Sequence, residues 1–333
     1  MGHEGIGRWR RIGLLFYIQL MPHSKSRLPE GMTVCCSDDG NALACLGRRV
    51  NVFDVRTCKR TLSTHPFSHP SDAAFSPDGK RLAVKYTSGR IVVLDVRTGD
   101  VLNDFKNPKG GDEGSEVLFS PDGREVIDGS WKGAITTRKL SNSTIAMQET
   151  FAGEMIERIS HDRARRTWLF QHQPIVRLGE NFPRPPYLTL QRWPLGKYKP
   201  KLLNLNVDII DSPTLSPDAS RICYVAIRRR VGCWIMISEA SDGALLASSG
   251  EIERGGTGSE LAWAVDGEIV GSVQSRRFVF YRSSDLSVIG EVPCTYPSSI
   301  CFLPGTDEIA LGTWNSSAVV KLSDIAAGRI KMR

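Results

Sequence analysis

The stretch DAAFSPDGKRLAVKYTSGRIVVLDVRTGDVLNDF, residues 72–105, contains the pattern that decides the fold. Four short, largely apolar runs alternate with turns built from Gly, Asp, Ser and Pro, the residues that tight turns require. The expected strands cover residues 72–75, 81–85, 91–96 and 101–105. This unit therefore predicts a small sheet of four consecutive strands, called a, b, c and d below.

The turn after the first strand of this unit recurs along the chain. Its sequence SPDG returns intact at residues 120–123, and weaker copies stand elsewhere. The seven copies are marked by Asp39, Asp78, Asp122, Asp162, Asp218, Asp266 and Gly305, at spacings of 39, 44, 40, 56, 48 and 39 residues. Repeats of roughly 40–45 residues with four strands each are typical of propeller blades. Several runs are apolar at successive positions, so both faces of each sheet must be covered, as they are when blades stack around an axis. The sequence predicts an all-β propeller of seven four-stranded blades.

These units resemble the WD-repeat β-propeller family over about residues 32–324. The dipeptide that closes each repeat in that family survives in part as Phe53-Asp54 and Leu94-Asp95, but no unit carries the family's Gly-His opening. The family's buried Asp-His-Ser-Trp hydrogen-bond network has no complete counterpart in any unit. The resemblance therefore implies a divergent member, and the fold prediction depends on the period and the turns.

The last unit supplies three strands of its own. We expect the apolar segment IGLLFYIQL, residues 12–20, to complete it, because pairing an N-terminal strand with the last blade hides two open edges. The alternative is that the C-terminal tail forms the fourth strand. The expected organisation is an N-terminal arm with this closure strand over residues 1–31, the propeller over residues 32–325 and a tail over residues 326–333.

The cysteines and the N-terminal segment indicate the cellular compartment in which the protein is expected. The eight cysteines show no paired metal-site spacing, and most lie in apolar runs, so we expect free thiols in a reducing compartment. The basic N-terminus and the apolar run after it resemble a secretory signal, but the run is too short to span a bilayer and no small-residue cleavage site follows it. We expect a cytoplasmic protein without a membrane span, with the nucleus as the alternative.

The sequence assigns no catalytic residue, metal site or cofactor. The six histidines are scattered, and neither a nucleophile elbow nor a phosphate-binding loop is present. The alternative is a propeller hydrolase or lactonase, whose repeats use similar turns and whose acid–base residues or metal ligands lie at the mouth of the central channel. Glu116, Glu157 and Asp211 are the strand-end candidates for such a site. They lack histidine partners at equivalent positions, so we predict a protein that is not an enzyme.

The turns between strands b and c are rich in arginine. Six of these four-residue turns hold 9 basic residues and no acidic one, where the average of 43 in 333 predicts about three. Because all b–c turns of a propeller lie on one face of the disc, we predict a basic surface there, called the b–c face below. Its basic residues are Arg48, Arg49, Arg90, Lys132, Arg228, Arg229, Arg230, Arg276 and Arg277.

These turns predict a partner-binding function. The planar guanidinium of arginine suits bidentate recognition of carboxylates and phosphates. We therefore expect a scaffold that binds an acidic or phosphorylated protein segment, with nucleic acid or anionic lipid as the alternative ligand. Trp131 and Trp314 in the same turns would add aromatic contacts. The proline-rich loop at residues 173–186 is either a recognition loop or a tolerated insertion.

Overall fold

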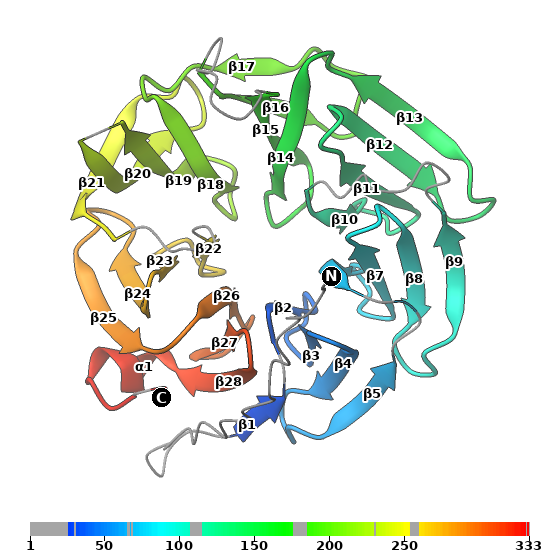
Figure 1. Ribbon diagram of the computed structural model, residues 1–333, viewed down its shortest axis with the longest axis horizontal. Helices are drawn as coiled ribbons and strands as arrows, with labels where there is room; N and C mark the ends of the chain where they lie inside the picture. The colour runs from blue at the N-terminus through cyan, green and yellow to red at the C-terminus, as the bar shows by residue number, and fades with distance from the viewer. Residues whose placement is uncertain are drawn as a thin grey trace, which may run out of the picture.

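The computed structural model describes residues 26–29, 31–64, 67, 69–106, 115–175, 185–229, 231–253, 260–330 and 332. Over this part of the chain, 28 strands form seven antiparallel sheets of four strands each. The sheets stand as blades around a central axis, in chain order (Figure 1). The chain is a seven-bladed β-propeller, as the repeat predicted.

The strands of the first three blades are given from the axis outward, as a, b, c and d. Blade 1 consists of β2 (Thr33–Cys36), β3 (Ala42–Leu46), β4 (Val50–Asp54) and β5 (Arg60–Thr64). Blade 2 consists of β6 (Pro70–Phe75), β7 (Arg81–Tyr86), β8 (Ile91–Asp95) and β9 (Val101–Phe105). Blade 3 consists of β10 (Val117–Phe119), β11 (Glu125–Gly129), β12 (Ala134–Lys139) and β13 (Ile145–Thr150).

The other four blades follow in the same order. Blade 4 consists of β14 (Glu154–His161), β15 (Thr167–Pro174), β16 (Tyr187–Arg192) and β17 (Lys201–Leu203). Blade 5 consists of β18 (Ile209–Leu215), β19 (Arg221–Arg228), β20 (Gly232–Glu239) and β21 (Leu245–Glu251). Blade 6 consists of β22 (Glu260–Trp263), β23 (Ile269–Gln274), β24 (Arg277–Arg282) and β25 (Val288–Pro293). Blade 7 consists of β26 (Pro297–Phe302), β27 (Glu308–Thr313), β28 (Ser316–Lys321) and β1 (Ser26–Pro29), and the helix α1 (Leu322–Ala326) follows it.

The recurring SPDG turn is held together by its own side chains. In blade 2, the Ser76 hydroxyl donates to Asp78 at 2.5 Å and accepts the backbone N–H of Arg81 at 3.0 Å. Gly79 takes a φ of +68°, which favours glycine. The same serine–aspartate bond recurs in the corresponding turns of blades 1, 3 and 5. The SPDG motif therefore recurs in the sequence because the same a–b turn, with the same side-chain bonds, is formed in several blades.

Apolar clusters fill every junction between neighbouring blades. Seven such clusters exist in the described residues, and each combines side chains of two adjacent blades. In the third strand of blade 2, Ile91, Val92, Val93 and Leu94 are all buried, because alternate residues face blades 1 and 3. Continuous apolar runs in the sequence are thus explained by sheets that are covered on both faces.

An N-terminal strand completes blade 7, as the sequence predicted, and this strand is β1. β1 pairs antiparallel with β28, with Ser26 opposite Val319, and Leu28 is buried in the cluster between blades 7 and 1. The predicted segment, residues 12–20, lies outside the described residues. A d strand is an outer edge that needs backbone pairing and little burial, as the exposed pattern of β21 illustrates, so hydrophobicity is a weak guide to its position in the sequence.

The C-terminal residues pack against the ring and do not form the fourth strand. Ile325 of α1, Ile330 and Met332 are buried in the cluster between blades 6 and 7. All eight cysteines are free thiols. In the described part of the chain, no helix has the length and apolar character needed to cross a bilayer.

Removing β1 tests ring closure. A chain that begins at residue 31 should melt at a lower temperature and form oligomers, because β28 then exposes unpaired backbone groups at a sheet edge. Calorimetry and size-exclusion chromatography measure both effects. A chain that begins at residue 23 keeps β1 and separates its contribution from that of earlier residues. A monomeric protein with the melting temperature of the full chain after truncation to residue 31 would contradict this account of closure.

Candidate functional site

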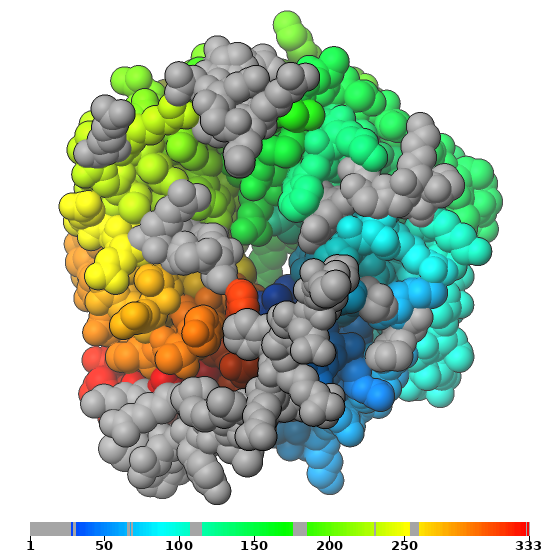
Figure 2. Space-filling model, viewed as in Figure 1, coloured from blue at the N-terminus to red at the C-terminus, as the bar shows by residue number. Residues whose placement is uncertain are grey.

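A central channel runs between the inner strands. It forms a cavity of about 520 Å³, and Figure 2 shows the ring hollowed at its centre. Its lining comes mainly from the a strands of the seven blades and the residues next to them, which converge there because the blades are repeats. The charged residues in the lining are Asp72, Glu116, Glu157, Arg158 and Glu260. Trp131, from a b–c turn, also lines it, so the cavity extends toward the b–c face.

Most inner strands are tied to the next blade by one kind of hydrogen bond. In each bond, the acceptor is a side chain on strand a, or on the residue just before that strand. The donor is a backbone N–H in strand a of the next blade. The five acceptor–donor pairs are Asp72 with Val117 (2.7 Å), Glu116 with Ile159 (2.7 Å), Ser160 with Leu215 (3.1 Å), Glu260 with Ile300 (3.3 Å) and Ser299 with Val34 (3.1 Å). Three of the channel's carboxylates therefore have a structural role.

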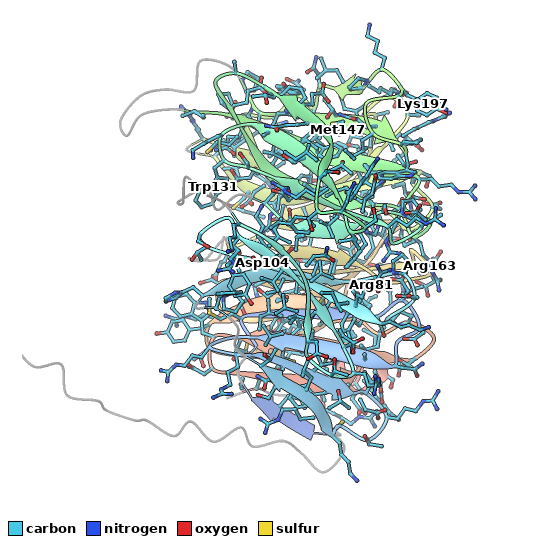
Figure 3. All side chains as sticks on the ribbon, turned by 90° about the vertical axis from the view of Figure 1, so that its right-hand side faces the viewer. Arg81, Asp104, Trp131, Met147, Arg163 and Lys197 are labelled. Carbon is cyan, nitrogen blue, oxygen red and sulfur yellow. The ribbon has the colours of Figure 1, made fainter. Side chains whose placement is uncertain are left out.

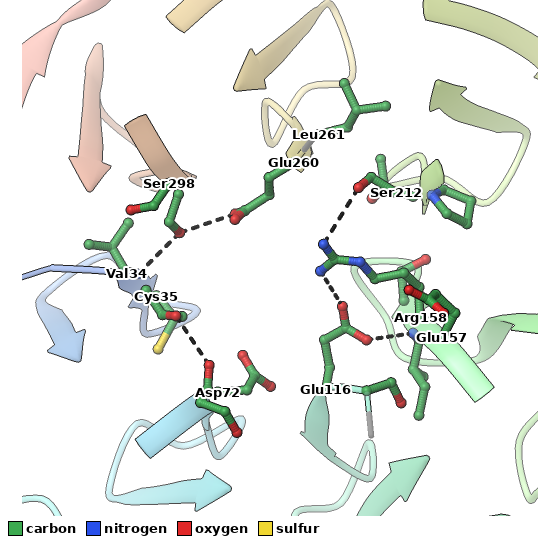
Figure 4. Close-up of a pocket in the computed structure, with 18 of the residues that line it drawn as sticks. Val34, Cys35, Asp72, Glu116, Glu157, Arg158, Ser212, Glu260, Leu261 and Ser298 are labelled. Carbon is green, nitrogen blue, oxygen red and sulfur yellow. Dashed lines mark hydrogen bonds and ion pairs between the residues drawn. The ribbon is translucent and has the colours of Figure 1, made fainter. Parts of the chain in front are cut away.

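Arg158 compensates part of the negative charge of the channel. Its guanidinium donates to Glu116 of blade 3 at 2.7 Å and to Ser212 of blade 5 at 3.5 Å (Figure 4). Burial alone would lower the pKa of Arg158, but the carboxylates of Glu116, Glu260 and Asp211 raise it. Arg158 therefore stays charged and links blades on either side of its own.

Two of the carboxyl groups bind protons unusually tightly. Burial, followed by the charge of Glu116, raises the pKa of Asp72 to about 7. Burial also raises the pKa of Glu260 to about 7, although Arg158 opposes it. Burial also raises the pKa of Glu157. Near neutral pH, the carboxyl groups of Asp72 and Glu260 in the channel are therefore partly protonated.

An ion pair crosses the axis at the opposite end of the channel. Arg165, in the a–b turn of blade 4, donates to both oxygens of Asp38 in the a–b turn of blade 1, with one bond at 2.9 Å. These blades are not neighbours, so the pair joins two sides of the ring. Burial, followed by the charge of Arg165, lowers the pKa of nearby His161 to about 4, so His161 is neutral at physiological pH.

The predicted basic residues lie at the turns of the b–c face, but not all are available to a partner. Figure 3 shows Trp131 of this face on one side of the disc and Arg81, Arg163 and Lys197 on the other. Those of the predicted set that are exposed are Arg48, Arg49, Lys132, Arg228, Arg229 and Arg276. Arg230 lies outside the described residues, as does most of the loop at residues 173–186.

Two predicted arginines are neutralised by acids on outer strands. Arg90 pairs with Asp104 and stands 3.4 Å from the centre of the Phe67 ring. Arg277 pairs with Glu291 at 3.0 Å. In both cases the acid follows fourteen residues later, on strand d. An acid fourteen residues after the arginine is thus the sequence signal for such an ion pair, and it lies outside the b–c turns.

Aromatic side chains accompany the exposed arginines. Trp131 and Trp314 are 44% and 47% exposed. Trp314 stacks on Tyr296, which is 60% exposed, with ring centres 5.8 Å apart. Tyr296 stands just before strand a of blade 7, so the composition of the b–c turns gave no sign of it. Among the described residues, no three histidine, cysteine, aspartate or glutamate side chains are grouped as metal ligands.

The fold and its channel define the class of this protein as a seven-bladed β-propeller. No protein-family model and no curated protein matches the sequence. Among solved structures, the chain is similar to Kuenenia stuttgartiensis hydrazine synthase, with a TM-score of 0.73 and 16% identity over 92% of this chain and 99% of that one. At this identity the likeness concerns the fold alone. Membership of the WD-repeat family stays a prediction.

The channel acids should make stability depend on pH. The folded pKa values of Asp72 and Glu260, about 7, lie above the unfolded values of about 4, so the folded protein binds more protons between them. Their contribution to stability is therefore present at low pH and lost as the pH rises through 7. We expect the melting temperature to fall from about pH 5 to about pH 8.

Substitution separates this effect from general charge. The variant Asp72→Asn with Glu260→Gln should lose most of the pH dependence that calorimetry measures over this range. The control, Asp242→Asn with Glu253→Gln, removes two exposed acids and should keep it. Equal slopes in the wild type and in both variants would show that the channel acids are not the cause.

Proposed function

We propose that this protein is a non-catalytic interaction scaffold whose b–c face binds an acidic or phosphorylated protein segment. The observation that carries the proposal is an arc of exposed side chains over four consecutive blades. Arg228 and Arg229 come from blade 5 and Arg276 from blade 6. The stacked pair of Tyr296 and Trp314 follows at blade 7. Arg48 and Arg49 of blade 1 complete this set, called the arginine–aromatic arc below.

The chemistry of the arc favours an anionic peptide. Guanidinium groups bind carboxylates and phosphates through paired hydrogen bonds, and an exposed aromatic pair offers apolar contact beside them. Nucleic acid would require aromatics interleaved along a basic groove, whereas the arc holds one stacked pair between two basic groups. A protein segment with a few negative charges and one apolar side chain fits this distribution better.

The channel supports the enzyme alternative less well. Glu116 and Glu157 do line one cavity, as a propeller hydrolase would require, and the similar solved structure is named as an enzyme. However, both oxygens of Glu116 already accept hydrogen bonds, from Arg158 and from the backbone of Ile159. Asp72 and Glu260 likewise hold neighbouring blades together. Carboxylates used in this way are poor candidates for proton transfer to a substrate.

Charge reversal on the arc tests the proposal. The variant Arg228→Glu, Arg229→Glu, Arg276→Glu should bind a fluorescent phosphoserine peptide or polyglutamate at least about tenfold more weakly than wild type, a loss of about 1.4 kcal/mol, as measured by anisotropy. Wild-type binding should weaken with added salt, because exposed charges are screened over roughly 8 Å at physiological ionic strength. The variant should lose most of this salt dependence.

A matched control distinguishes a specific surface from net charge. The variant Arg56→Glu, Lys80→Glu, Arg97→Glu places three reversals of exposed residues on the opposite face. Equal weakening by both variants would contradict the proposal. Tighter binding of the wild type to single-stranded RNA or to phosphatidylserine vesicles than to the peptides would favour the alternative ligand classes.

A further inference from the structure

Two cysteines meet where the propeller ring closes. The Sγ atoms of Cys36, in strand a of blade 1, and Cys301, in strand a of blade 7, are 3.0 Å apart. A disulfide bond joins its sulfurs at about 2.0 Å, so an approach of about 1 Å separates this contact from a covalent bond. The Cys36 thiol also lies 3.4 Å from the carbonyl oxygen of Phe302.

This junction differs from the other six in its place in the chain. Cys36 and Cys301 are 265 residues apart, whereas the other junctions join blades that follow one another directly. Its non-covalent ties include the bond between Ser299 and the Val34 N–H and the cluster around Leu28. A covalent link here would tie the first inner strand of the ring to the last.

We propose that Cys36 and Cys301 form a redox-active dithiol, which a low-molecular-weight disulfide such as oxidised glutathione converts into a disulfide across the ring closure. The thiolate of one cysteine attacks the glutathione disulfide, forms a mixed disulfide and releases one glutathione thiolate. The thiolate of the second cysteine then attacks the protein sulfur of the mixed disulfide and releases the second. Two electrons pass from the cysteines to the oxidant, and the two thiol protons end on the two glutathiones.

The surroundings of the pair keep its thiols protonated and slow their exchange. The hydrogen bond between the two thiols, followed by burial, raises the pKa of Cys36. Burial, followed by the nearby Cys301, also raises the pKa of Cys35. Few thiolates are therefore present at neutral pH, and thiol–disulfide exchange should be slow there. Both Cys36 and Cys301 are half-buried residues.

The disulfide would act on stability. A cross-link between residues 265 apart removes many conformations from the unfolded chain, and the gain grows with loop length. Oxidation should therefore raise the melting temperature, by roughly 5 °C for a chain of this size. Reduction should return it to its starting value.

The test uses the full-length protein. After reduction and removal of the reductant, it is incubated with oxidised glutathione at about pH 8, where thiolates are more abundant. Thiol titration under denaturing, non-reducing conditions should fall from eight per chain by two, with the rise in melting temperature given above. Mass spectrometry of a non-reduced digest should identify the Cys36–Cys301 peptide pair directly, which does not depend on any variant.

Serine variants assign the bond. Cys36→Ser and Cys301→Ser should each abolish the rise in melting temperature, whereas Cys58→Ser, which removes another half-buried cysteine of the same cluster, should retain it. A thiol count that stays at eight would overturn the proposal. So would a stable mixed disulfide with glutathione, or a cross-link of Cys301 to Cys35 in place of Cys36.

Discussion

No blade of this ring can bury both of its apolar faces without a neighbour on each side. The seven clusters between blades meet this requirement, and the hydrogen bonds between inner strands add a polar tie at five of the seven junctions. The ring must therefore close, although its last blade begins with only three strands of its own. β1 supplies the fourth, and the contact between blades 7 and 1 becomes the one junction formed between distant parts of the chain.

Local rules in the sequence were enough to predict the blades. The serine and aspartate of the a–b turn bond each other and the backbone within a few residues, so their repetition marks blades 1, 2, 3 and 5, and weaker copies of the turn mark the other three. The closure strand depends on backbone pairing across almost the whole chain, and its four residues have no distinctive composition. The ion pairs of Arg90 and Arg277 with strand d were likewise invisible to an inspection of single turns. Asp72 and Glu260 lie in one channel only because the ring brings blades 2 and 6 together around its axis. Their positions in the sequence did not predict this.

Two different surfaces result from this geometry. The channel gathers acids that mostly bond to neighbouring strands, with Arg158 among them and the Arg165–Asp38 pair at its far end. The b–c face gathers exposed arginines beside a stacked aromatic pair. A scaffold presents its recognition groups on turns that the blades hold in place. The contrast between the two surfaces is the basis for assigning recognition to the face and structure to the channel.

The central claim is that partners bind at the arginine–aromatic arc. Arginine modification by phenylglyoxal, with and without a saturating phosphoserine peptide and followed by mass spectrometry, measures which guanidiniums a bound ligand covers. The account predicts protection of Arg49, Arg228 and Arg276 on the b–c face, with unchanged modification of Arg56 and Arg97 on the opposite face. Protection confined to the opposite face, or equal protection on both, would contradict it.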